Sequence, residues 1–380
     1  MTLRTLLIEP LDVLMLRGNK SFGDSGEHGA SSMPPGPSVL SGALRSFWLA
    51  EQAVDTRQFR RAAPDSLKEP LRTQLGTPTQ PGTFRLTETG LAREIGKGLE
   101  RLYPLPADLV LQKKTKAGAE DKPVVYRLTP TRLPDGLLTG DTAHPMMAIL
   151  KAPPGKPESG WWLNEDGFRA YLKGEIPKTE HLLRTADLWK SDWRLGIGLA
   201  ADSRTAEDGQ LYTTEAVALK SDIRLLATIS GAADFPDKGT LRLGGDGRAA
   251  AFHAVTVNDL PAPTLKNGRI KLLLTGPAIL PQGSGLPGEV NGVIRFPGGT
   301  ARIVATSIPR HQVVSGWDLA NWQPKPAERV VPAGAVYWLE DIRFSGASLQ
   351  TALQDWLLCD LDAQRRAEGY NACRLAAWLD

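Results

Sequence analysis

A polar loop close to the N-terminus carries side chains suited to binding phosphate. Residues 17–31 read RGNKSFGDSGEHGAS and are rich in glycine. Glycines let the backbone adopt positive φ and approach a ligand closely, and Arg17, Lys20 and His28 are suitable donors to phosphate oxygens. Ser38 is placed to cap a following helix, which would add free N–H groups and a positive dipole end near the loop. We therefore predict an anion-binding loop, and the alternative is an ordinary mobile connection.

Catalytic and metal-binding patterns are sparse in the rest of the chain. The five histidines and two cysteines show no zinc spacing, and there is neither a G-x-S-x-G elbow nor a P-loop. The segment LRLGGDGR at 241–248 has two interpretations: a purely structural turn, or a tight turn that presents Arg242 and Arg248 to RNA. His28 is the only candidate acid–base residue, with a contact or surface role as the alternative. We predict no metal and no cofactor.

Composition indicates a globular chain with two or three domains, since it has 380 residues of which 41% are hydrophobic. The formal charge of +3 restricts any nucleic-acid site to a local patch. The two cysteines fit a reducing, cytoplasmic setting, and no window of about 18 apolar residues predicts a membrane span. Tryptophans gather at 161–162, 189–193 and 317–322. Exposed ones would stack on unpaired bases, but packing in a core or subunit interface is the commoner use.

The apolar patterns predict a mixed α+β protein. Residues 3–8 and 13–16 look like halves of a strand broken at Pro10, which favours a buried edge-type or kinked strand. Range 55–190 has a weaker pattern and is interpreted as an insertion or extended subdomain. The remaining predicted elements are a helix with one apolar face over 40–48, strands at 193–200, 211–218, 222–229 and 269–275, a linker at 259–268, and a closing helix whose apolar face runs from Leu349 to Leu361.

Several segments, in the expected order, resemble one known family. They are 8–45 (IEPLDVLMLRGNKSFG…PPGPSVLSGALR), 103–111 (YPLPADLVL), 194–213 (RLGIGLAADSRTAEDGQLYT), 241–248 (LRLGGDGR) and 316–338 (GWDLANWQPKPAERVVPAGAVYW). Together they resemble the third Cmr subunit, a RAMP protein of type III-B CRISPR effector complexes.

This resemblance implies an α+β fold of two tandem ferredoxin-like (RRM-like) domains. The first would span 1–258 with the insertion at about 55–190, and the second 266–380. It also implies a non-catalytic, cytoplasmic role in antiviral defence, in which the subunit holds the 5′ tag of the CRISPR RNA. The implied partners are the large polymerase/cyclase-like Cmr subunit and the backbone RAMP subunit, with target RNA contacted only indirectly.

The matching motif positions supply the candidate site. The predicted RNA-binding residues are Arg17, Asn19, Lys20, His28, Ser31, Ser38, Arg45, Arg194, Arg204, Arg248 and Lys325. Three positions depart from the family pattern: Gly36 interrupts a proline run, Ala335 replaces a usual serine, and Asn371 stands where glycine is expected. Asparagine tolerates a left-handed backbone better than most residues, so the turn can survive, with a less favourable approach for RNA.

Two other functions compete with this interpretation. One is a RAMP-type, metal-independent endoribonuclease that processes CRISPR RNA precursors with His28 as acid or base, although the sequence offers no second catalytic partner. The other is a scaffold whose tryptophans mainly bury protein interfaces. The lysine-rich stretch 113–132 would contact guide RNA or an acidic subunit, or remain a solvated loop.

Overall fold

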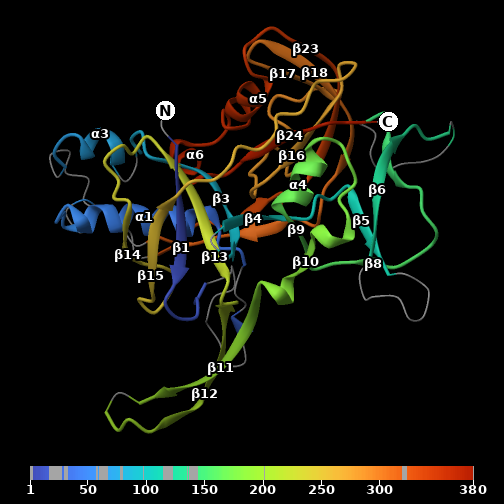
Figure 1. Ribbon diagram of the computed structural model, residues 1–380. Coiled ribbons are helices and arrows are strands. Elements are labelled where there is room, and N and C mark those ends of the chain that lie inside the picture. The colour runs from blue at the N-terminus through green and yellow to red at the C-terminus, as the bar shows by residue number, and fades with distance from the viewer. Residues whose placement is uncertain are drawn as a thin grey trace.

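Figure 1 shows the computed structural model, which describes residues 3–16, 28–29, 33–56, 59, 67–77, 80–96, 98–113, 123–134, 136, 144–200, 202–318 and 323–379. Within these ranges the chain is mainly β-strand with few helices, and no described helix is long and apolar enough to cross a membrane. A long hairpin of β11 (Trp189–Leu199) and β12 (Ala206–Leu219) extends away from the body (Figure 1). This hairpin confirms the strands predicted over 193–218.

β1 (Leu3–Pro10) lies inside an eight-stranded sheet, between β13 and β15 and antiparallel to both. Leu6, Leu7 and Ile8 are at most 3% exposed, so both faces of the strand are covered. The prediction of an edge strand is therefore wrong. The sheet order is β10-β9-β4-β3-β13-β1-β15-β14, with β3 (Arg85–Ile95), β4 (Gly98–Pro104), β9 (Trp161–Asn164), β10 (Leu182–Arg184), β13 (Ile223–Ser230), β14 (Lys238–Arg242) and β15 (Ala249–Val255).

α1 (Pro37–Glu51) is the predicted helix and packs its apolar face on this sheet. Phe47 and Trp48 meet Phe235, with ring centroids 5.8 and 5.3 Å apart. The predicted cap is wrong, because Gly36 is the N-cap residue and Ser38 lies inside the first turn without a capping hydrogen bond. Pro37 starts the helix two residues early, since its fixed φ is already helical and its missing N–H is not needed there.

The second large sheet has five strands in the order β17-β18-β23-β16-β24. α5 (Leu349–Leu357) packs on one face through Leu353, Trp356 and Leu357, and it ends four residues before the predicted Leu361. The other elements here are β16 (Ile270–Leu274), β17 (Val293–Phe296), β18 (Gly299–Ser307), β19 (Gln312–Val314), β20 (Trp317–Asp318), β21 (Gln323–Pro324), β22 (Glu328–Val330), β23 (Val336–Phe344), α6 (Ala363–Glu368) and β24 (Cys373–Ala376).

The two sheets share one arrangement of four strands. In the first, the order β3-β13-β1-β15 places the earliest strand between the third and the fourth, and in the second β18-β23-β16-β24 does the same. All neighbouring pairs in both sets are antiparallel. Each set also packs against one long helix, α1 in the first and α5 in the second.

Range 55–190, predicted as an insertion, contributes to the main sheet and to the contact between the sheets. It supplies β3, β4, β9 and β10 to the eight-stranded sheet and also holds the short helix α3 (Leu71–Leu75). Phe168 and Tyr171 of α4 (Glu165–Leu172) lie in one buried cluster with Trp338 of the second sheet. A further small sheet contains β7 (Met147–Leu150), β6 (Val124–Thr131), β5 (Leu109–Gln112) and β8 (Pro157–Glu158), in that order.

A buried ion pair joins the five-stranded sheet to the segment between β4 and β5. Lys271 of β16 is 2% exposed and Asp108 is fully buried, and the lysine Nζ lies 2.8 Å from the Asp108 Oδ2. The same Nζ lies 3.9 Å from the ring centroid of Tyr171. Burial lowers the pKa of Lys271, and the charge of Asp108 opposes that effect. Because two charges here are removed from water, each depends on the other.

Replacing Lys271 with methionine is expected to destabilise the protein by about 3–5 kcal/mol, because it leaves Asp108 buried without its counter-charge. Urea unfolding of the full chain measures this loss. The double variant Lys271→Met/Asp108→Leu removes both charges and should regain most of the stability. A double variant as unstable as the single one would contradict this account of the pair.

Candidate nucleic-acid interface

The predicted polar loop is anchored to the long hairpin. β2 (His28–Gly29) pairs in parallel with β12, with His28 opposite Thr213 and Gly29 opposite Thr214. On the other side of β12, Thr214 is opposite Arg194 of β11. The three-stranded order β11-β12-β2 therefore brings one end of the loop to the strand pair that carries the predicted Arg194. The sequence shows both segments but not this pairing.

The hairpin holds its two predicted arginines in different places. Arg194 is exposed and forms an ion pair of 3.0 Å with Asp192, two residues earlier on the same strand. Such a surface pair contributes little stability and leaves the guanidinium accessible. Arg204 lies in the turn between the strands, where its φ is 53° and its N–H donates to the carbonyl oxygen of Ala200 at 2.8 Å. Both side chains are open to solvent.

At the base of the loop, a buried carboxylate gathers the start of α1 and the late segment of the chain. The hydroxyl of Ser38 donates to Glu368 Oε2 at 2.7 Å and lies 3.0 Å from the hydroxyl of Tyr370. Arg365 Nη1 lies 2.9 Å from the same carboxylate oxygen, and Lys325 Nζ lies 3.3 Å from the other. Two predicted site residues, Ser38 and Lys325, thus meet on one acid that the prediction omitted.

The electrostatics of this network favour an ionised Glu368. Burial opposes ionisation, but Lys325, Ser38 and Arg365 outweigh it and hold the pKa of Glu368 below its usual range. Arg365 also donates to Glu328 Oε1 of β22, at 2.7 Å from its Nη2. The network therefore fixes the first turn of α1, α6 and β22 relative to one another. Its arginine and lysine are committed to protein carboxylates.

Two more predicted arginines are held by protein groups. Arg45 donates to the carbonyl oxygens of Leu75 and Phe84, and burial lowers its pKa to about 10. Arg248 forms an ion pair with Asp12, and its turn packs on the chain just before the loop, where Gly245 N–H donates to the Met15 carbonyl oxygen at 2.7 Å. These residues support the loop and its helix. Both guanidinium groups are therefore bonded to protein groups, and neither points to solvent without a partner.

Four predicted residues lie outside the described part of the chain, namely Arg17, Asn19, Lys20 and Ser31. For His28 the structure describes the backbone only.

The tryptophans at 161 and 162 are buried, which supports packing rather than base stacking for that pair, whereas Trp193 on the hairpin is 57% exposed. Asn371 adopts φ 60° and its side-chain N donates to the Leu357 carbonyl oxygen at 2.8 Å, so the turn survives without glycine.

Glu368 and Arg365 were missed because an acid and its buried partner are not phosphate ligands. The one signal near them was the segment 368–374, which drew attention only through Asn371. Gly369, between the acid and that asparagine, has φ 94°, and a Cβ there would lie 2.7 Å from the Leu86 carbonyl oxygen. This close approach seats the end of α6 against β3.

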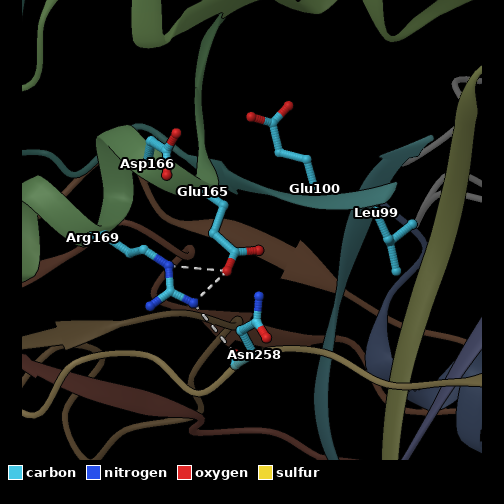
Figure 2. Close-up of a pocket in the computed structure, with 6 residues that line it drawn as sticks. All are labelled: Leu99, Glu100, Glu165, Asp166, Arg169 and Asn258. Carbon is cyan, nitrogen blue, oxygen red and sulfur yellow. Dashed lines mark hydrogen bonds and ion pairs between the residues drawn. The ribbon is translucent and has the colours of Figure 1, made fainter. Parts of the chain in front are cut away.

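A surface pocket elsewhere is unsuited to phosphate. It has a volume of about 400 Å³ and is lined by Leu99, Glu100, Glu165, Asp166, Arg169 and Asn258. Figure 2 shows Glu165 and Arg169 pointing toward each other, with the arginine also reaching Asn258. Arg101 reaches Glu165 as well, at 2.9 Å between Nη2 and Oε1. With its one lining cation paired, the pocket is an acidic structural joint between β4, α4 and the segment after β15.

Replacing Glu368 with glutamine is expected to destabilise the protein by about 3 kcal/mol at pH 7, because it leaves buried cations without their partner. The folded pKa lies below the unfolded value of about 4.3. The loss is therefore fully present above that value and disappears as the pH falls through the folded pKa. Urea unfolding at pH 7 and below about pH 4 measures the difference. The exposed Glu51→Gln is the control, and an effect independent of pH would contradict the network.

Comparisons with known proteins identify the family. The model of the CRISPR-associated protein family Cas_Cmr3 matches residues 6–378. A chain in a cryo-EM structure of type III-B Cmr-beta bound to cognate target RNA has 15% identity and a TM-score of 0.50, with 97% of this chain and 96% of that chain covered. A chain in a similar structure that also contains AMPPnP has 14% identity and a TM-score of 0.48, with 97% of this chain and 95% of that chain covered.

A chain of a type III-A Csm3-Csm4 subcomplex matches with 11% identity and a TM-score of 0.35, covering 90% of this chain and 94% of that one. No curated protein is significantly similar. The first structural match shows the shared fold, and the family match extends over nearly the whole length. The chain belongs to the Cas_Cmr3 family of CRISPR-associated proteins.

Proposed function

We propose that this protein is a non-catalytic RNA-binding subunit of a type III-B effector complex, and that it holds the 5′ tag of the CRISPR RNA. The observation that carries the proposal is the pairing of β2 with β12, which ties the glycine-rich loop to the hairpin. A loop fixed at both ends can present its amides and cations in one direction, which phosphate recognition needs. The Glu368 network holds the start of α1, after the loop, through Ser38, and Gly245 holds the chain just before the loop at Met15.

The proposed division of labour follows from which cations are engaged. Arg45, Arg248 and Lys325 are bonded to protein groups, so they position the site. Arg194 and Arg204 are exposed on the hairpin and are the described candidates for direct contact with RNA. In this proposal the RNA is also contacted by the loop residues Arg17, Asn19, Lys20, His28 and Ser31.

We also propose that both halves are ferredoxin-like (RRM-like) domains, over 1–258 and 266–380. The strand order of each sheet supports this, since the first strand lies between the third and the fourth and all pairs are antiparallel. No helix is described between β13 and β15, and α6 of the second half packs on α1 and β3 of the first. The two proposed domains would thus share α6, which belongs to the second and packs on the first.

A bridging role between the large subunit and the backbone RAMP subunit is proposed as well. Four apolar residues alternate along β11 and are 48–70% exposed: Trp193, Leu195, Ile197 and Leu199. Alternate residues of a strand share one face, so the four form a continuous apolar stripe. A stripe of this size on a soluble protein marks an interaction surface.

The triple variant Arg17→Ala/Lys20→Ala/His28→Ala is expected to weaken capture of tag-bearing RNA by the assembled complex by at least about tenfold, because it removes the loop's phosphate donors. Filter binding with and without the tag measures this. The control is Arg72→Ala/Lys238→Ala, which removes the same formal charge from scattered exposed sites, because His28 counts as neutral. Equal capture by the two variants would remove the loop from the site.

Purified protein is expected to leave CRISPR repeat RNA intact, because the proposal gives His28 a contact role. Gel analysis after incubation with EDTA tests this against the endoribonuclease alternative. Metal-independent cuts that are lost in His28→Ala would establish that alternative and overturn the non-catalytic assignment.

A further inference from the structure

Three arginines lie side by side on the outer strands of the second sheet. Arg295 of β17 is opposite Thr300 of β18, and Thr300 is opposite Arg343 of β23. In the next row, Arg302 of β18 stands opposite Glu340 of β23. Directly paired residues point to the same face of a sheet. With strands about 4.8 Å apart, the three Cα atoms fall within about 10 Å of one another.

Within the described residues, this arginine patch (Arg295, Arg302, Arg343) has no protein partners. All three side chains are exposed, and among the described residues none of them forms an ion pair or a side-chain hydrogen bond. Ile294 and Ile303 are the chain neighbours of Arg295 and Arg302. They point the other way and are buried under α5. The two rows contain one acid, Glu340, which stands opposite Arg302, so the patch keeps a net positive charge. Two residues before Glu340, Trp338 is buried against Tyr171, so the patch lies beyond the covered part of this face.

The composition of the arginine patch favours a phosphate backbone over a protein partner. The cores of protein interfaces are enriched in aromatic residues and methionine as well as arginine, whereas the two rows hold three arginines, a threonine, a glutamate and the half-buried Val293, with no aromatic residue or methionine. Arginine has forked donors that match phosphate oxygens. Contacts to phosphate make up most of the polar contacts in nucleic-acid interfaces.

The arginine patch is also remote from the proposed tag site. In Figure 1, β17, β18 and β23 lie at the top of the molecule, and the β11–β12 hairpin that pairs with the loop extends from the bottom. We infer that the arginine patch is a second RNA-binding surface, which holds an RNA backbone through its phosphates and without reading sequence. It does not depend on the tag site, and the two can be tested separately.

The test compares Arg295→Ala/Arg302→Ala/Arg343→Ala with the scattered control Arg72→Ala/Lys238→Ala/Lys266→Ala. Both full-length variants are titrated with an unstructured fluorescent RNA that lacks the tag, between about 20 and 200 mM salt. Each phosphate contact on a single strand contributes about 0.7 to the slope of log affinity against log salt. The patch variant is therefore expected to lose about 2 from this slope and to bind at least tenfold more weakly at the lowest salt.

The control should lose less than threefold in affinity, and both variants should melt like the wild type because the changed side chains are exposed. A patch variant that binds RNA like the control overturns the inference. So does a variant that keeps its RNA affinity but fails to co-purify with another Cmr subunit, because the arginine patch would then be a protein contact. The loop variant at residues 17, 20 and 28 should retain most tag-independent binding, which separates failure of this inference from failure of the tag site.

Discussion

The buried carboxylate of Glu368 is the interaction on which the candidate site depends. It accepts from Ser38 in the first turn of α1, from Arg365 on α6 and from Lys325 in the late segment. A buried charge without these partners would be costly, so the three elements have to meet at this point. The start of α1, directly after the loop, consequently has a fixed place in the fold.

The same principle operates where the five-stranded sheet meets the segment between β4 and β5. Lys271 and Asp108 come from opposite sides of a packed interface, and each is stable there only because of the other. Around them, Tyr171 and Trp338 belong to one apolar cluster that includes residues from both halves. α6 adds a further link by packing on α1 and β3. The two halves are thus joined by a shared core rather than by a flexible tether, and a partner bound to one half has a rigid connection to the other.

Charge is distributed in a way that the net value of +3 conceals. Many cations are neutralised by nearby acids, as in the pair of Arg101 with Glu165. Others are exposed, among them Arg194 and Arg204 on the hairpin and the three arginines of the patch on the second sheet. The proposed function requires contact with RNA and with proteins at once. Local positive areas on a nearly neutral surface allow RNA contact without general attraction to nucleic acid.

Local patterns in the sequence determined the helix over 37–51, the strands of the hairpin, the strand at 270–274 and the turn at Asn371, because periodicity and backbone preference are properties of neighbouring residues. The family motifs added the identity of the chain. Only the tertiary structure decided that β1 is central, that 55–190 contributes strands to the main sheet, and that Ser38 binds Glu368 rather than capping its helix. It also decided that His28–Gly29 pairs with β12 and that three distant arginines share one face. These outcomes rest on strand pairing and charge burial between residues far apart in the chain, and the spacing of apolar residues carries no information about which distant strand will be the neighbour.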